Sequence, residues 1–337
     1  MAMVCARIRL CFAAIALLLL AAAAAPVAAQ QPNSVNPNGS AVHEQQLLDQ
    51  LHRVQGLGTI PDTKSYVIEQ PQGRDWRQYK NGTLPLIGTI AMLGMIVLLA
   101  VFFVVRGMVR IRSGRSGVNI VRFNAFERFV HWMTATCFIL MALTGLNITF
   151  GRTALLPLLG PDAFSTWSLA AKYIHNFLSF PFTLGVILIL FMWLGGNLPD
   201  RTDLNWLAKG GGIVGKEEPP AYRFNAGQKM IYWVVVLAGA AVAVTGYLLM
   251  FPFFGTTIAG MQLAQMIHGT VAVLFVAIMI AHVYIGTIGM EGAFEAMGSG
   301  TVDLNWAKEH HSLWLEEEGA RTGPNQRQPQ PAATPAE

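Results

Sequence analysis

Four histidines lie inside or at the ends of long apolar stretches of this chain: His131, His175, His268 and His282. An ionisable side chain in a membrane-spanning segment is costly unless a ligand, an ion or another polar group compensates for it. Neutral imidazole nitrogens are good ligands for iron. Four such side chains therefore indicate two pairs of iron ligands.

The spacing of the histidines predicts which of them pair. His268 and His282 are fourteen residues apart, so on a helix they share one face and lie roughly 21 Å apart along the axis. The stretches carrying His131 and His175 enter the membrane from opposite sides, which matches His131 in depth with His282 and His175 with His268. Each pair can bind both faces of one planar iron macrocycle. An iron with two imidazole ligands has no vacant position, which favours electron transfer over oxygen binding.

Other chemistries stay open for these histidines. A membrane histidine can simply bond a polar neighbour, and four of them could form a proton relay or a non-haem metal site. The three cysteines provide neither a disulfide framework nor a thiolate cluster, because Cys5 and Cys11 lie in the apolar leader and only Cys137 remains. The sequence has no Cys-x-x-Cys-His attachment motif, so any haem is held non-covalently, as haem b.

Small and basic residues near the histidines fit the same hypothesis. Glycines that would admit a flat macrocycle, or simply allow close helix packing, are Gly145, Gly185, Gly246 and Gly269. Arg122, Arg128 and Lys172 lie near the ends of the stretches, where they would meet haem propionates or act as ordinary interfacial anchors.

The composition is that of an integral membrane protein. Hydrophobic residues make up 53% of the chain and charged residues only 12%, against about 25% charged in soluble domains. The net charge of +4 does not indicate a nucleic-acid partner, because the basic residues lie in short segments beside apolar stretches. Stretches long enough to cross a bilayer are 84–105, 129–150, 173–193, 231–251 and 263–288.

Backbone groups inside lipid must bond one another, so all five stretches are predicted to be helical. The predicted fold class is an all-α integral membrane protein: a transmembrane four-helix di-haem bundle plus one extra N-terminal transmembrane helix. The predicted segments are a signal peptide (1–29), a mostly extended periplasmic arm (30–82) with one helical candidate (41–54), the additional transmembrane helix (83–106), the di-haem four-helix domain (107–290), and a cytoplasmic tail (291–337) with an amphipathic patch (306–314) and a disordered end. An uncleaved first anchor is the alternative to the signal peptide.

Basic residues predict the orientation in the membrane. Those on one side are Arg106, Arg110, Arg112, Arg115, Arg122 and Arg128 after the first span, and Arg201, Lys209, Lys216, Arg223 and Lys229 after the third. The opposite side has only Arg152 and Lys172 in its two short loops, although Arg74, Arg77 and Lys80 in the arm oppose the assignment. A secretory signal places the arm outside. We therefore expect a bacterial inner-membrane protein with a periplasmic arm and a cytoplasmic C-terminus.

Several motifs in roughly residues 118–317 recur in a known family. They are Arg-Phe-Asn-Ala-Phe-Glu-Arg-Phe-Val-His-Trp (122–132), Asn-Leu-Pro-Asp (197–200), Phe-Asn-Ala-Gly-Gln-Lys-Met (224–230), the stretch carrying His268 and His282, and Trp-Ala-Lys-Glu-His-His (306–311). With them the chain resembles the cytochrome b (gamma) subunit of membrane-bound respiratory formate dehydrogenases. Its first 105 residues depart from the shorter members, whereas longer members look like this chain.

The resemblance implies a non-catalytic electron-transfer subunit. It would anchor an iron–sulfur beta subunit and a molybdenum- or tungsten-containing alpha subunit, take electrons through two b haems, and reduce membrane quinone near the cytoplasmic haem. The implied haem-iron ligands are His131, His175, His268 and His282, and the implied quinone residues are Asn225, Gly227 and Gln228, with His282 close by. Asn225 and Gly227 could instead only cap the following helix.

Two alternatives to this function remain at the level of sequence. Within the same class, the chain could be the cytochrome b subunit of a hydrogenase or of a thiosulfate reductase, since the histidine spacing is shared with hydrogenase cytochromes b. In a different class, it could be a proton-coupled or metal transporter, which would favour acidic residues or broken helices at mid-membrane depth. The predicted spans lack such acidic residues. Formate oxidation itself is not expected of this chain, because it lacks the cysteine set and the nucleotide motif that molybdenum and iron–sulfur chemistry would need.

Overall fold

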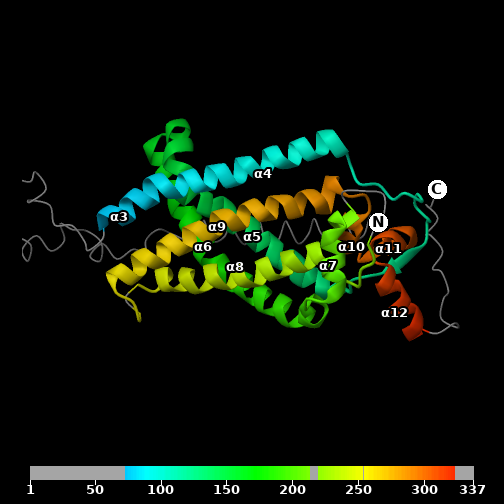
Figure 1. The fold of residues 1–337 in the computed structure, drawn as a ribbon. Coiled ribbons are helices and arrows are strands. Elements are labelled where there is room, and N and C mark those ends of the chain that lie inside the picture. The colour runs from blue at the N-terminus through cyan, green and yellow to red at the C-terminus, as the bar shows by residue number, and fades with distance from the viewer. Residues whose placement is uncertain (1–72, 213–218, 253, 323–337) are drawn as a thin grey trace, which may run out of the picture. The chain divides into compact units, whose positions relative to one another are not determined.

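The computed structural model describes residues 73–212, 219–252 and 254–322 (Figure 1). The signal peptide, the helical candidate at 41–54, most of the arm and the end of the tail lie outside these residues. In the described part, helices long and apolar enough to span a membrane are Gly73–Arg106, Ala125–Ala154, Leu156–Asn197, Ala226–Met250 and Ile258–Gly289. The predicted all-α membrane fold with five spans is confirmed.

The first span begins earlier than the boundary predicted at residue 83. Helix α3 (Gly73–Gln78) and the π-helical turn η2 (Tyr79–Thr83) lead without a break into α4 (Leu84–Arg106). Two bonds fasten this start to α9 (Ile258–Tyr284): Trp76 Nε1 donates to Gln265 Oε1 (2.9 Å), and the Tyr79 and Thr270 hydroxyls are 2.5 Å apart. The polar composition of this segment predicts an extended arm, but its contacts with α9 stabilise it as a helix. Helix α4 continues alongside α9 (Figure 1).

The second and third spans form a hairpin. Helix α5 (Ala125–Ala154) starts with a capping box, in which Asn124 accepts from the backbone N–H of Glu127 and Glu127 accepts from that of Asn124. Helix α6 (Leu156–Trp193) follows almost at once. It is interrupted only at Gly160, which has a φ of +75° and stands directly before Pro161. The predicted short loop with Arg152 and Lys172 is thus helical, because the apolar residues on both sides of the glycine kink continue the two helices.

The fourth and fifth spans form a second hairpin of α8 (Ala226–Met250) and α9. Asn225 caps α8, and Thr257 caps α9 by accepting from the N–H of Gly260 (3.2 Å). The π-helical turn η5 (Ile285–Gly289) extends α9. The turn η3 (Leu194–Asn197), helix α7 (Arg201–Ala208) and the turn η4 (Gly210–Gly212) connect α6 towards α8.

The described part of the predicted tail is a folded cap on the bundle. Its elements are α10 (Ala293–Gly298), β2 (Thr301–Asp303), α11 (Leu304–His310) and α12 (Ser312–Thr322). Strand β2 pairs antiparallel with β1 (Asn119–Val121), with Ile120 opposite Val302. The predicted amphipathic patch is buried instead: Trp306 and Trp314 are 2% and 4% exposed and lie in a core shared with residues of α5, α6 and α8.

Candidate functional site

The four histidines form two pairs inside the bundle. His131 on α5 faces His282 on α9 with ring centres 6.3 Å apart, and His175 on α6 faces His268 on α9 at 6.2 Å. All four rings are half-buried. The structure thus brings together the same partners that the matching of depths predicts, one pair towards each end of α9.

The separation within each pair suits one metal ion between two imidazoles. Metal–nitrogen bonds of about 2 Å on both sides place the two ring centres roughly 6 Å apart. In residues 73–212, 219–252 and 254–322, no group of three or more His, Cys, Asp or Glu side chains is placed to hold a metal. Each pair therefore fits a metal that brings further ligands of its own, as the iron of haem does, and His131, His175, His268 and His282 are the residues that would hold it.

Hydrogen bonds orient the rings of the second pair. His175 Nδ1 lies 3.0 Å from Thr144 Oγ1 and 3.1 Å from the carbonyl oxygen of Met141. His268 Nδ1 lies 3.0 Å from Thr245 Oγ1, and the His268 ring also bonds the backbone of Val242. Because a carbonyl can only accept, Nδ1 of His175 carries the proton and Nε2 keeps a lone pair for a metal.

Two of the four predicted glycines border these rings. A Cβ on Gly145 would lie 3.3 Å from His175 Cε1, and a Cβ on Gly246 would lie 3.2 Å from His268 Cε1. Gly185 and Gly269 serve helix packing instead, since their closest side chains are Thr134 and Leu84. Gly145 and Gly246 therefore leave room for the imidazoles.

The first pair has a different surrounding. His131 Nδ1 is buried and has no hydrogen-bond partner in the described part of the chain. The His131 ring meets Trp132 edge-on, with centres 5.2 Å apart, and Trp132 Nε1 donates to the carbonyl oxygen of Met297 (2.8 Å). An orphaned imidazole nitrogen in a half-buried ring is the kind of group that a bound metal or polar ligand would satisfy.

Arg122 is a buried support of the cap. Its side chain donates to the carbonyl oxygen of Arg223 and lies 3.1 Å from His311 Nε2. Burial, with the nearby charge of Arg223 acting in the same sense, lowers the pKa of Arg122 to about 9. Of the other basic residues predicted near propionates, Arg128 donates to the carbonyl oxygen of Gly298 (2.9 Å), and Lys172 is exposed on α6.

The predicted quinone residues lie at the start of α8, where they form a capping box. Asn225 Oδ1 accepts from the backbone N–H of Gln228 (2.9 Å), and Gln228 Oε1 accepts from that of Asn225 (3.1 Å). Gly227 faces Trp206, which a Cβ would approach to 3.1 Å. The structure thus shows the capping role. The two amide nitrogens have no hydrogen-bond partner among the described residues, so they remain available as donors.

Lys229, in the motif Phe-Asn-Ala-Gly-Gln-Lys-Met (224–230), makes an ion triad that sequence reasoning missed. Its Nζ lies 2.7 Å from Asp200 Oδ2 and 2.9 Å from Asp203 Oδ2, which ties α8 to α7. Burial alone would raise the pKa of Asp200, but hydrogen bonds from Lys229 and Thr202 outweigh it and lower that pKa to about 2. Two features of the sequence could have indicated this triad: the basic Lys229 within the capping motif, and the Asp-x-x-Asp spacing of Asp200 and Asp203.

Thr144 and Thr245 were missed as well, although the sequence carries a signal for them. The chain repeats Arg-Phe-Asn-Ala at Arg122 and Arg223, and the same offset along the chain relates Thr144-Gly145 to Thr245-Gly246. An internal repeat of this kind identifies residues that serve equivalent places in the two helical hairpins.

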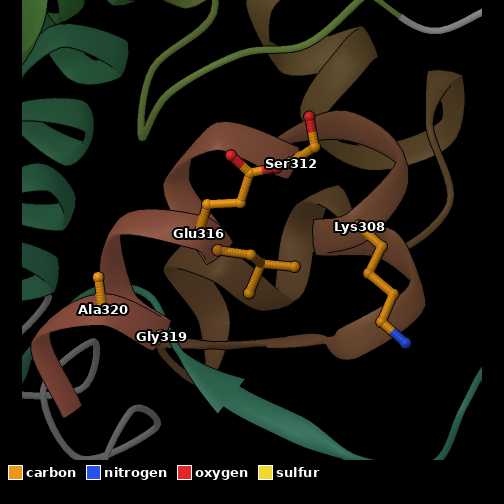
Figure 2. Close-up of a pocket in the computed structure, with 6 residues that line it drawn as sticks. Lys308, Ser312, Glu316, Gly319 and Ala320 are labelled. Carbon is orange, nitrogen blue, oxygen red and sulfur yellow. The ribbon is translucent and has the colours of Figure 1, made fainter. Parts of the chain in front are cut away.

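Two hollows lie away from the histidine pairs. The larger, about 460 Å³, lies in the cap and is lined by Lys308, Ser312, Leu315, Glu316, Gly319 and Ala320 (Figure 2). The other, about 320 Å³, is an apolar groove between α8 and α9 that begins at Trp233. None of the predicted site residues lines either hollow.

Comparison with known proteins places this arrangement in a sequence family. Residues 122–300 match the family described as prokaryotic cytochrome b561. The cytochrome b556(fdo) subunit of formate dehydrogenase from Escherichia coli (strain K12) is 32% identical over 203 residues, which cover 59% of this chain and 93% of that protein. The nitrate-inducible cytochrome b556(Fdn) subunit of the same organism is 28% identical over 204 residues, or 59% and 91% of the two chains. The formate dehydrogenase cytochrome b556 subunit of Haemophilus influenzae is 29% identical over 207 residues, or 59% and 84%.

Proposed function

Because the chain belongs to the prokaryotic cytochrome b561 family, we propose that it is the membrane cytochrome b subunit of a formate dehydrogenase, carrying electrons from a periplasmic iron–sulfur subunit to membrane quinone. The observation that carries the proposal is the arrangement of the four histidines in two pairs. The ring centres within each pair are 6.3 and 6.2 Å apart, which is the spacing expected for one metal ion bound between two imidazoles. When bound there, haem b supplies reversible one-electron chemistry. Membership of a cytochrome family weighs against the transporter alternative.

The protein's own residues have separate tasks in this function. Thr144 and Thr245 hold the rings of His175 and His268 with Nδ1 protonated, so that Nε2 is presented as the ligand. His268 and His282 share α9, which holds the two pairs roughly 21 Å apart along one rigid helix. A fixed spacing of this kind suits transfer across the membrane, because neither pair needs to move.

The quinone is assigned to the start of α8, near the His131 and His282 pair. Asn225 and Gln228 have amide nitrogens available to donate to a quinone oxygen, while their oxygens keep the helix capped. The apolar groove that begins at Trp233 runs between α8 and α9 past Leu237 and Ile278, and it suits an isoprenoid tail. These features support the quinone role of Asn225, Gly227 and Gln228.

The orientation and the partners follow from charge and from the relatives. The end of the bundle with His131 and His282 carries the arginine-rich segment 106–128 and the folded cap, which supports a cytoplasmic location for it. The His175 and His268 end would then face the periplasm, beside the iron–sulfur beta subunit. The molybdenum- or tungsten-containing alpha subunit would complete the complex in the bacterial inner membrane, with residues 1–29 as the signal for export.

A spectroscopic experiment tests the function. The detergent-purified complex should show b-type bands in a reduced-minus-oxidised spectrum, with two haems per copy of this chain. The variant His268→Ala should lose one haem and keep the other, because only the His175 and His268 pair is broken. His43→Ala, outside the predicted spans, serves as the control and should keep both. A complex without b-type bands overturns the proposal, and loss of neither haem in His268→Ala overturns the pairing.

A further inference from the structure

Helices α5 and α8 are copies of one pattern in sequence and in structure. At one constant offset, Arg122-Phe-Asn-Ala becomes Arg223-Phe-Asn-Ala, and Thr144-Gly145 becomes Thr245-Gly246. Both helices begin with a full capping box, at Asn124 and at Asn225. Each is followed by a helix that carries one histidine of the same pair, His175 on α6 and His268 on α9. The two hairpins thus present their histidines to each other in equivalent ways.

The hydrogen bonds around these two histidines repeat with the same offset. Thr144 Oγ1 donates to the carbonyl oxygen of Leu140 (2.9 Å), one turn earlier, and Thr245 Oγ1 donates to that of Ala241 (2.6 Å). A threonine hydroxyl has a single proton, so once that proton is given to the helix backbone the oxygen can only accept. It accepts from Nδ1–H of His175 or of His268, at 3.0 Å in both cases.

Among the residues that the structure describes, the other histidine pair has no counterpart of this arrangement. The α8 position equivalent to His131 is Tyr232, whose hydroxyl donates to the carbonyl oxygen of Leu190 (2.8 Å). His131 Nδ1 has no hydrogen-bond partner in the described part of the chain. The chain therefore ties the Nδ1 atoms of one pair through a duplicated Thr-Gly element and leaves at least one ring of the other pair untied.

The geometry points to Thr144 and Thr245 as positioning residues that orient His175 and His268 and make this pair the more electron-donating of the two iron-binding sites. An oxygen acceptor at Nδ1–H increases the basicity of Nε2, and a more basic ligand stabilises the oxidised metal. The site at His175 and His268 accordingly has a lower reduction potential than it would have without the two hydroxyls. Gly145 and Gly246 belong to the same element, since a Cβ at these positions would lie 3.3 Å from His175 Cε1 and 3.2 Å from His268 Cε1 and would press on the rings. This inference rests on the proposed function, because it concerns ligands of a bound haem.

The test is a redox titration of the two haems in the purified complex, followed by absorption, with haem content measured in parallel. Thr144→Val and Thr245→Val each remove one hydroxyl at nearly constant volume. We expect both haems to remain bound, one midpoint potential to rise in each variant, the same haem to be affected in both, and the larger rise in the double variant. The electron paramagnetic resonance signal of that oxidised haem should shift as well, because its ligand orientation changes.

Matched variants separate positioning from helix structure. Thr144→Ser and Thr245→Ser keep the hydroxyl and should retain the wild-type potentials. Thr149→Val removes a hydroxyl of α5 whose one hydrogen-bond partner among the described residues is the carbonyl oxygen of Gly145, and it should change neither potential. If a valine variant fails to assemble, the serine variant must restore assembly together with the wild-type potential. Unchanged potentials in the double valine variant, equal shifts of both haems, or an equal shift in Thr149→Val overturn the inference. A wild-type complex without b haems would instead overturn the proposed function.

Discussion

The guanidinium carbon of Arg122 lies 5.1 Å from the centre of the Trp306 indole ring and at the same distance from that of Trp314. Arg122 precedes α5, whereas the two tryptophans belong to the cap. The arginine is only 3% exposed and donates to the carbonyl oxygen of Arg223. One buried cation therefore joins the start of the first hairpin, the segment before α8 and the C-terminal helices.

Replacing Arg122 should loosen the cap. Arg122→Ala removes the cation–π contacts with Trp306 and Trp314 of the cap and a charged donor to buried acceptors, for a cost of roughly 2–4 kcal/mol. Hydrogen exchange of α11 and α12 should measure it as faster exchange in these helices. Arg115→Ala is the control: Arg115 is also paired, with Glu291 and Glu295, but its side chain is 52% exposed, and the loss should stay below about 1 kcal/mol. Equal exchange in both variants would contradict the role of Arg122.

His311 should make the same cap sensitive to acid. Its Nδ1 donates to the carbonyl oxygen of Tyr222 (2.6 Å) and its Nε2 accepts from Arg122, so the folded cap needs a neutral ring. Burial, helped by the charge of Arg122, holds the pKa of His311 well below its usual value. The unfolded state therefore binds the proton more strongly, and cap stability should fall by about 1.4 kcal/mol for each pH unit below about 6.5.

Hydrogen exchange of α11 and α12 at pH 7.5 and 5.5 would measure this dependence. His311→Gln, which keeps a donor and an acceptor but does not titrate, should remove the difference between the two pH values. A pH effect of the same size in His311→Gln would assign the sensitivity to another group.

Sequence patterns predicted the spans and the pairing of the histidines because both depend on simple regularities. An apolar stretch must be helical in lipid whatever surrounds it, and the helix rise converts the separation of His268 and His282 into depth. The start at Gly73 could not be predicted in this way. It depends on bonds from Trp76 and Tyr79 to α9, and such bonds join residues far apart in the chain.

The cap and the threonines escaped prediction for related reasons. A tryptophan in a short segment of mixed polarity is equally compatible with a position at the membrane surface and with one in a protein core. Only the contacts of Trp306 with Arg122 in the structure show that it belongs to a core. Thr144 and Thr245 are ordinary residues in membrane helices, where a hydroxyl commonly bonds the preceding turn. Their meaning comes from the histidine on the neighbouring helix, and the internal repeat was the signal that could have exposed it.

A methyl group at Gly246 should weaken one haem site. Gly246→Ala would place a Cβ 3.2 Å from His268 Cε1, so the ring must shift away from its position opposite His175. We expect the haem content to fall from two towards one per chain, as measured by the pyridine haemochrome assay. Gly94→Ala on α4 is the matched control, since no atom of the described residues lies within 4 Å of its Cβ position. Full haem content in Gly246→Ala would contradict the need for a glycine beside His268.

The ion triad at the start of α8 should also contribute stability that depends on pH. Asp200 accepts from Lys229 Nζ at 2.7 Å, and the pKa of Asp200 is lowered to about 2 although burial alone would raise it. Because the folded-state pKa lies below the unfolded value, this stability is fully present above about pH 4 and is lost as the pH falls towards 2.

Asp200→Asn should lower the melting temperature at pH 7 and show a smaller further drop between pH 6 and pH 3 than the wild type. Asp162→Asn, an exposed residue of α6, should behave like the wild type at both pH values. A melting temperature for Asp200→Asn that equals that of the wild type at pH 7 would show that Asp203 alone holds Lys229.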